Sequence, residues 1–238
     1  MRNVVWAAAL ILAAAVPAQA QMRWQDRGFA NVNFLFQPAS RDADLNGEFP
    51  LYDETGTFEG ARQIGGGAVF DVAGGARVWR NVAVALGFSR FGNSNSVSIT
   101  ARVPDPFVFD APLEQTLSAG ELDHSETAVH ISAVWFWPYS DKIDVALFAG
   151  PSFVSVNHET VTAVNVIENT ATADGVTTAE ASETAVGIHI GADVSYMFTP
   201  RYGAGVLLRY VGGSVDVPGV DSLGVGGFQL GAGVRVRF

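Results

Sequence analysis

The feature that most constrains this chain is a strict alternation of apolar residues with polar or small ones, which is clearest at its C-terminal end. Between Phe228 and Phe238 every second residue is apolar, and the intervening residues are glycine, glutamine or arginine. Alternation with a period of two gives a β-strand one apolar and one polar face. A strand of this length, tilted by about 40°, spans about 25 Å, which is the height of the apolar band of a membrane β-barrel.

The same alternation recurs upstream, so the pattern belongs to the whole chain. Together with the last segment the repeats predict eight strands, the smallest even number that closes a membrane barrel. The sequence therefore predicts an all-β fold, an eight-stranded antiparallel transmembrane β-barrel. The upstream segments are residues 28–37, 64–79, 81–89, 126–137, 143–153, 184–198 and 202–210.

Residues 1–20 have the pattern of a secretory signal peptide. A positive Arg2 is followed by an apolar run over residues 4–16 and by a small-x-small cleavage site that ends at Ala20. We therefore expect residues 1–20 to be removed and residues 21–238 to form the barrel domain.

Composition indicates that the rest of the chain contacts lipid. Apolar residues make up 48% of the sequence and charged residues only 16%, whereas about a quarter of an average soluble domain is charged. No later stretch has the roughly eighteen consecutive apolar residues that a membrane helix needs. Backbone groups in hydrocarbon must all be paired, so a closed barrel is the remaining solution. The formal net charge of −10 argues against nucleic acid as a partner.

The predicted connections alternate between short and long. Outer-membrane barrels have short periplasmic turns and long extracellular loops, so both chain ends are expected on the periplasmic side. Most acidic residues fall in the long connections. The short turns are 80–81, 138–141 and 199–201, and the long loops lie near 38–61, 92–124, 157–183 and 214–222.

The chain resembles small outer-membrane barrel families, such as the OmpA-type transmembrane domain and OmpX. The ending VRVRF, with terminal Phe238, looks like the C-terminal signal that the barrel-assembly machinery recognises, and the block GGARVWRNVAVALGFSRF is also similar to these families. The resemblance implies a monomer in the cell outer membrane. Its implied partners are the assembly machinery, outer-membrane lipid and lipopolysaccharide.

Alternation alone does not say which face is outside. A soluble, lipocalin-like binding barrel would point its apolar face inward around a ligand. The polar parity here is mostly glycine, alanine and serine with a few charges, and small side chains fit the crowded interior of a narrow barrel. The sequence therefore favours the apolar face toward lipid.

The charged residues of the inward parity form a predicted polar network in the lumen. Buried charges must be paired, and arginine pairs through several fixed donors, so one interpretation is a closed polar plug. The alternative is a narrow gated pore in which His130 and His189 respond to protons. An eight-stranded interior is just filled by side chains, which favours the plug. The network consists of Asp71, Arg77, Glu126, His130, Asp144, His189, Asp193, Arg209, Gln229, Arg235 and Arg237.

An enzymatic alternative rests on His130-Ile131-Ser132. This triplet resembles the His-x-Ser element of outer-membrane lipid A deacylases, in which an acid orients the histidine as base for the serine. Asp144 or Glu126 would supply the acid. His130 and Ser132 share the polar parity, however, whereas a lipid-cleaving site should face the bilayer. The sequence therefore favours a protein that is not an enzyme.

A possible calcium loop begins at Asp42. The sequence Asp42-Ala43-Asp44-Leu45-Asn46-Gly47 resembles D-x-D-x-N-G, and Asp53 stands at the twelfth place, where glutamate is usual. The helices that flank such a loop in an EF-hand are not expected here. A solvated acidic hairpin over residues 42–53 is the alternative, and no cofactor is predicted. The most consistent function is a non-enzymatic barrel that anchors acidic surface loops for envelope integrity, adhesion or another surface interaction.

Overall fold

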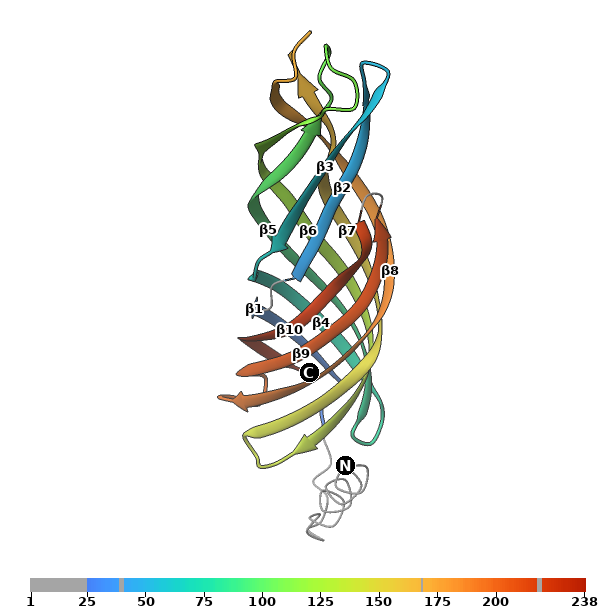
Figure 1. The fold of residues 1–238 in the computed structure, drawn as a ribbon. Helices are drawn as coiled ribbons and strands as arrows, with labels where there is room; N and C mark the ends of the chain where they lie inside the picture. The colour runs from blue at the N-terminus through green and yellow to red at the C-terminus, as the bar shows by residue number, and fades with distance from the viewer. Residues whose placement is uncertain (1–24, 39–40, 168, 218–219) are drawn as a thin grey trace, which may run out of the picture.

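The computed structural model describes residues 25–38, 41–167, 169–217 and 220–238, so the predicted signal peptide lies outside the described residues. The chain forms a tall, narrow cylinder of strands (Figure 1). Arg27 and Gly28 donate backbone hydrogen bonds of 2.8 and 2.7 Å to the carbonyl oxygen of Phe238, so the two described ends lie together. No helix in the described part is long and apolar enough to cross a membrane.

Eight of the strands close into a ring. They pair in the order β1, β4, β5, β6, β7, β8, β9 and β10, and β10 pairs back with β1, which confirms the predicted antiparallel barrel. The hairpin of β2 and β3 joins this ring through a pairing of β3 with β5 (Figure 1). The strands are β1 (Gly28–Gln37), β2 (Arg41–Leu51), β3 (Glu54–Ile64), β4 (Gly67–Trp79), β5 (Val82–Val103), β6 (Leu113–Pro138), β7 (Ile143–Val166), β8 (Ala173–Met197), β9 (Tyr202–Val217) and β10 (Val220–Arg237).

The lower part of the barrel has the predicted inward and outward faces. Val32 and Val234 lie opposite each other in the β1–β10 ladder and face outward, whereas Asn33 is buried inside. Phe34 is 71% exposed and Val186 is 68% exposed. Large apolar side chains exposed all round a closed sheet are the pattern of a wall that faces lipid. A lipocalin-like barrel, with this row around an internal cavity, is therefore wrong.

Glycines on the inward parity let neighbouring strands approach closely. A Cβ atom at Gly233 would lie 1.9 Å from the carbonyl oxygen of Val32, and one at Gly150 would lie 1.8 Å from that of Ile131. A side chain at either place would force the ladder apart. The small residues of the polar parity are therefore a requirement of the narrow wall.

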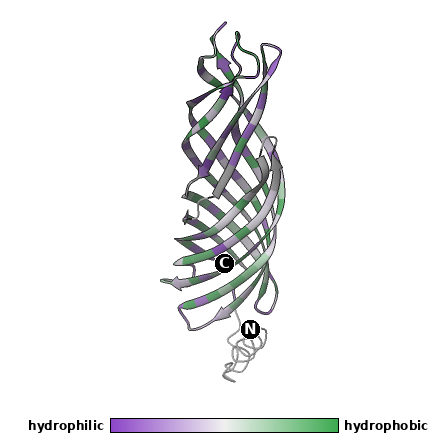
Figure 2. Ribbon diagram, in the orientation of Figure 1, coloured by the Kyte–Doolittle hydropathy of each residue, from purple (hydrophilic) through white to green (hydrophobic). Residues whose placement is uncertain are grey.

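Above the wall that faces lipid, the strands continue into an extension made of β2, β3 and residues 91–124 and 157–183. Here the apolar residues face inward and the polar residues face outward: Val97 and Ile99 are buried inside, whereas Ser98 between them is exposed. Leu45 and Phe58 of the hairpin belong to the same apolar core. Figure 2 shows hydrophobic residues along the lower strands and more hydrophilic residues on the upper ones.

The prediction of long loops near 38–61, 92–124 and 157–183 is therefore wrong over most of their length. β6 alone has 26 residues and reaches far beyond its predicted start at residue 126. Exposed acids such as Asp44, Glu59 and Asp123 occupy the outer face of strands whose other face is apolar. The acids had suggested loops, but a second apolar core holds these segments in a sheet.

Candidate functional site

The structure places the predicted lumen residues on the inward parity of six strands. Arg77 and Asp144 lie close to the periplasmic turns and are partly exposed. The other residues are buried inside the barrel, where the sequence placed them. They are Asp71, Glu126, His130, His189, Asp193, Arg209, Gln229, Arg235 and Arg237.

One ion pair crosses the lumen between β9 and β4. The Nη1 atom of Arg209 lies 2.7 Å from Oδ2 of Asp71, and Asn33 donates from Nδ2 to Oδ1 of the same carboxylate at 2.7 Å. Arg209 also donates from Nε and Nη2 to Oε1 of Gln229, at 2.9 and 2.7 Å. Gln229 in turn donates to Oε1 of Gln37 at 3.0 Å. Pairing and charge-assisted hydrogen bonds offset the cost of burying both charges.

A second ion pair is joined to the first through Asn33. Arg235 donates to both carboxylate oxygens of Asp193, with an Nε to Oδ1 distance of 3.1 Å. Its Nη1 donates to Oδ1 of Asn33 at 2.6 Å. Ser195 donates to Asp193, and Arg237 reaches the hydroxyl of Ser195 at 3.5 Å. Because Asn33 bonds both pairs, the charged groups form one connected network.

The opposite wall carries a chain of serines and histidines. His130 bonds Ser89 through Nε2 at 2.9 Å and Ser152 through Nδ1 at 2.8 Å. His189 bonds Ser152 through Nδ1 at 2.9 Å and Ser132 through Nε2 at 2.8 Å. Both nitrogens of each ring are therefore occupied. The chain could pass a proton between hydroxyl and imidazole groups, but it ends at serines inside the wall.

The grouping expected for a deacylase is not formed. Ser132 contacts His189 rather than His130, whose two nitrogens already bond other serines. Glu126 bonds a different histidine, and Asp144 lies at the periplasmic end of β7. Ser132 is buried on the inward face, away from the bilayer. The serine and its base face a closed interior instead of a lipid.

Two apolar clusters enclose these polar chains. The upper cluster is continuous with the core of the extension and includes Phe91, Val154 and Leu207. A cavity of about 50 Å³ lies between the clusters, lined by residues of both polar chains, and has room for only a few waters. The described lumen is thus a small enclosed space rather than an open passage. The lower cluster consists of Phe29, Ala83, Ala85, Val134, Phe136 and Ala146.

A third polar cluster, which the sequence analysis missed, holds the β2–β3 hairpin to the barrel. The ladder between β6 and β7 ends at the pair of His124 and His158. At this point Arg62 of β3 donates from Nη2 to the carbonyl oxygen of Leu122 and from Nη1 to that of Glu159, both at 2.6 Å. One guanidinium therefore satisfies carbonyls of both strands where the strands stop bonding each other.

Burial sets the charge in this third cluster. Burial is the largest cause, and together with the nearby charges of Arg62 and His124 it lowers the pKa of His158 to about 4. Glu159 acts in the opposite direction, as the smallest cause. Arg62 can only donate, so Nδ1 of His158, 3.0 Å from Nη1, must be the acceptor. His158 is thus a neutral imidazole beside a buried arginine.

A sequence signal existed for the histidines but not for the arginine. His124 and His158 continue the inward parity of β6 and β7 beyond the predicted strand ends. Arg62 lies on a hairpin outside the ring, and alternation along β3 does not show which strands its side chain meets. The pairing of β3 with β5 decides that contact.

The possible calcium loop is mostly a strand. Residues 41–51 form β2, so Asp44 and Asn46 lie on one exposed face of an extended chain. A calcium loop folds its oxygens around a centre, whereas a strand spreads alternate residues along a line. The side chain of Asp42 lies outside the described residues. The backbone thus corrects the loop prediction to a hairpin whose turn is at Tyr52 and Asp53.

Solved structures show what this fold is similar to, although no protein-family model and no curated protein sequence matches the chain. The outer membrane protein OprG from Pseudomonas aeruginosa matches with 9% identity and a TM-score of 0.50, covering 92% of this chain and 99% of that one. Neisserial surface protein A matches with 15% identity, a TM-score of 0.48, and coverage of 89% and 97%. The outer membrane protease OmpT from Escherichia coli matches with 9% identity, a TM-score of 0.37, and coverage of 93% and 100%.

The OprG match supports the fold alone. The apolar residues exposed on the outer wall indicate that this fold lies in a membrane. Closed antiparallel barrels with an outward apolar band are proteins of the outer membrane. The chain is therefore a small outer-membrane β-barrel, and the predicted localisation holds.

Proposed function

We propose that this protein is a non-enzymatic outer-membrane barrel whose closed lower part anchors an acidic, strand-built extension outside the cell. The extension contacts lipopolysaccharide through divalent cations and so contributes to the integrity of the envelope. Assembly into the membrane depends on Phe238 as the C-terminal signal, and the barrel acts as a monomer.

The distribution of charge carries this proposal. The two ion pairs of the lumen, Arg209 with Asp71 and Arg235 with Asp193, are buried, whereas the described part of the extension exposes many carboxylates and few cations. Arg102 is the exposed cation among the described residues of the extension, and it already pairs with Glu114 at 2.8 Å. Unmatched carboxylates bind hard divalent cations, which also bind phosphate groups. The exposed acids are Asp44, Glu48, Asp53, Glu59, Asp110, Glu114, Glu121, Asp123, Asp174, Glu180 and Glu183.

The test is binding of the purified barrel to vesicles that contain lipopolysaccharide, with magnesium or with a chelator. We expect binding with magnesium, and its loss in the triple variant Glu121→Gln, Asp123→Asn, Glu180→Gln. Asp141→Asn, in a periplasmic turn, is the control and should bind like the parent. Equal binding with the chelator, or by the triple variant, would disprove contact through cations.

The closed lumen also separates this proposal from its alternatives. An anchor shows no discrete conductance steps in planar bilayers, because the polar chains lie between apolar clusters. It also releases no acyl chains from lipid A, and Ser132→Ala leaves that result unchanged. Conductance steps, or acyl release that Ser132→Ala abolishes, would favour the pore or the hydrolase.

A further inference from the structure

Each of the three periplasmic turns exposes one cation. Arg80 lies between β4 and β5, Lys142 between β6 and β7, and Arg201 between β8 and β9. No described side chain forms an ion pair with any of the three. Asp141 is the acid within these turns, so the turns carry a net positive charge.

Backbone hydrogen bonds fix the positions of these turns. Met197 donates to the carbonyl oxygen of Lys142 at 2.7 Å, and Arg237 donates to that of Arg201 at 2.8 Å. In the turn between β4 and β5, Phe136 donates to the carbonyl oxygen of Asn81 at 2.8 Å, so each turn is tied to a neighbouring strand. The three cations are spaced round the rim by the barrel itself, and they do not depend on loop conformation.

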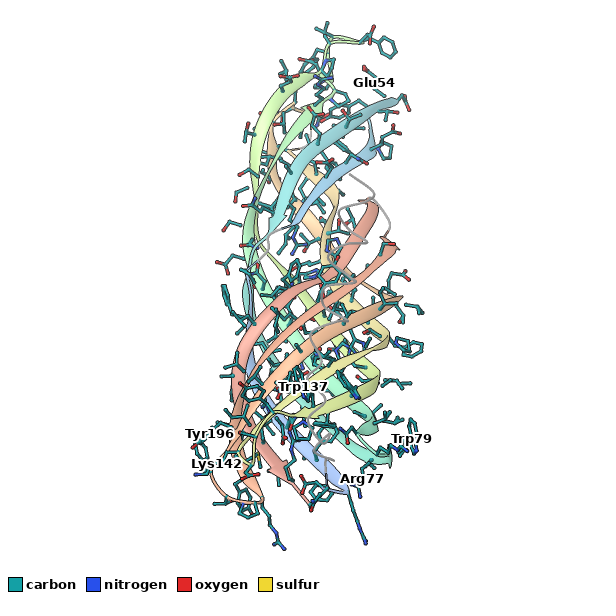
Figure 3. All side chains as sticks on the ribbon, turned by 90° about the horizontal axis from the view of Figure 1, so that it is seen from below. Glu54, Arg77, Trp79, Trp137, Lys142 and Tyr196 are labelled. Atoms are coloured by element: carbon teal, nitrogen blue, oxygen red, sulfur yellow. The ribbon has the colours of Figure 1, made fainter. Side chains whose placement is uncertain are left out.

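Each turn has exposed aromatic residues in it or next to it, such as Trp79, Tyr139 and Tyr202. Arg80 lies over the ring of Trp79, with its Cζ atom 4.9 Å from the ring centroid. Figure 3 shows Arg77, Trp79, Trp137, Lys142 and Tyr196 toward one end of the molecule and Glu54 at the other. Amphipathic rings favour the depth where acyl chains meet headgroups. The exposed aromatic residues at this rim are Trp79, Trp135, Trp137, Tyr139, Tyr196, Phe198, Tyr202 and Phe238.

We propose that Arg80, Lys142 and Arg201, with these aromatic residues, form a collar that binds the headgroups of anionic phospholipids in the periplasmic leaflet. The exposed aromatic residues of the rim lie at the boundary between acyl chains and headgroups. Each cation lies in the adjoining turn, at the depth of the lipid phosphates. Cations close to an anionic membrane surface are attracted to it. The proposal rests on the barrel being in the membrane and is independent of the proposed contact with lipopolysaccharide.

The arrangement of the collar fits lipids better than a protein. A protein partner needs one contiguous patch, whereas these cations are separated round the ring by pairs of strands. Lipids surround a barrel on all sides, so a ring of separate sites fits them. On the opposite side of the membrane, the exposed charges of the described residues of the extension are mainly acidic.

The experiment measures which lipid contacts the collar. The three tryptophans of the described chain, Trp79, Trp135 and Trp137, all lie at this rim, so brominated lipids that bind there quench their fluorescence. In vesicles of phosphatidylcholine and phosphatidylglycerol, we expect stronger quenching when the bromines are on phosphatidylglycerol. The triple variant Arg80→Gln, Lys142→Gln, Arg201→Gln should quench equally with either brominated lipid.

The matched control removes exposed cations from the other side of the molecule. Arg90→Gln with Arg102→Gln should keep the preference, and a heat-modifiable shift in gel mobility should show that every variant is folded. The collar would be overturned if the triple variant kept the parent's preference for brominated phosphatidylglycerol. It would also be overturned if the control variant lost that preference to the same extent as the triple variant. Sedimentation with purified peptidoglycan that depends on the three cations, without a lipid preference, would assign the ring to the cell wall instead.

Discussion

The lower barrel and the extension share strands β5 to β8 but place opposite kinds of residue on the same faces. On β5 the odd-numbered residues point inward throughout. In the lower part they are small or polar, as at Gly87 and Ser89, with Leu86 outside; in the extension they are apolar, as at Val97 and Ile99. Strand geometry is constant, so the surrounding medium decides the pattern: lipid outside the lower part and water outside the extension.

The two regions are therefore held together by different interactions. The lower interior depends on ion pairs and hydrogen bonds that Asn33 joins into one network. The interior of the extension depends on burial of apolar side chains such as Phe58 and Ile99. The same kind of substitution should have different effects in the two places.

The largest expected effect comes from breaking an ion pair in the lower interior. Asp71→Ala leaves Arg209 buried opposite no carboxylate and should lower the free energy of unfolding by about 3–5 kcal/mol. Urea unfolding in lipid vesicles, followed by gel mobility, measures the loss. The control is Asp123→Ala, an exposed acid of the extension. A loss no greater than that of the control would show that the pair does not hold the barrel together.

A large truncation inside the extension should destabilise that region only. Ile99 is 1% exposed, and Ile99→Ala should cost about 2–5 kcal/mol through lost burial and a cavity. We expect faster hydrogen exchange in β2, β3 and the upper parts of β5 and β6, with unchanged exchange in the lower strands. Equal acceleration in both regions would mean that they unfold as one unit.

A charge added to the outer face should affect the stability of the two regions differently, and this difference tests the comparison most directly. Leu86→Arg puts a cation on the face that contacts lipid and should cost about 2–4 kcal/mol. Ser96→Arg, on the same face of the same strand but above the lipid, should change stability by no more than about 0.5 kcal/mol. Equal costs in the vesicle unfolding assay would contradict the position assigned to the membrane boundary.

The smallest expected effect is a pH dependence of the hairpin. Burial lowers the pKa of His158 to about 4 in the folded protein, from 6.5 when unfolded, so the unfolded state binds more protons between these values. Attachment of β2 and β3 should be complete above pH 6.5 and weaken as the pH falls toward 4, because a charged imidazole would face Arg62. His124 and Glu159 also face this group, and His124 adds to the weakening.

Limited proteolysis of the hairpin across this pH range measures the effect. His158→Gln keeps a hydrogen-bonding side chain but cannot gain the charge, so its cleavage should vary less with pH. Cleavage of both proteins that rises equally on acidification would assign the effect to the carboxylates of the outer face.

Alternation was sufficient to predict the ring but not the extension. Segments such as 28–37 and 202–210 have most of their large apolar residues on one parity, and the structure places these segments as predicted. The hairpin of β2 and β3 lacked a recognisable turn, because its turn residues are Tyr52 and Asp53, with φ of 53° and 59°, rather than the Asn-Gly pair that usually adopts such angles. Its acids then suggested a loop.

For the lumen, parity predicted which residues point inward but not which of them meet. Ser132 and His189 are 57 residues apart, and their contact depends on the stagger of β6 against β8 across β7. The bridging role of Asn33 depends in the same way on where β1 lies between β4 and β10. Such contacts follow from the closure of the whole ring, which no single segment specifies.

The pairing of β1 with β10 has a consequence for how the molecule comes into being. The first and last strands of the ring are neighbours, so the backbone groups on the free edge of β1 stay unbonded until residues 230–237 arrive. Hydrocarbon cannot solvate those groups, so a partly formed sheet has no stable place in the bilayer. Insertion of the barrel into the outer membrane should therefore be all-or-none, and it should follow the completion of chain synthesis.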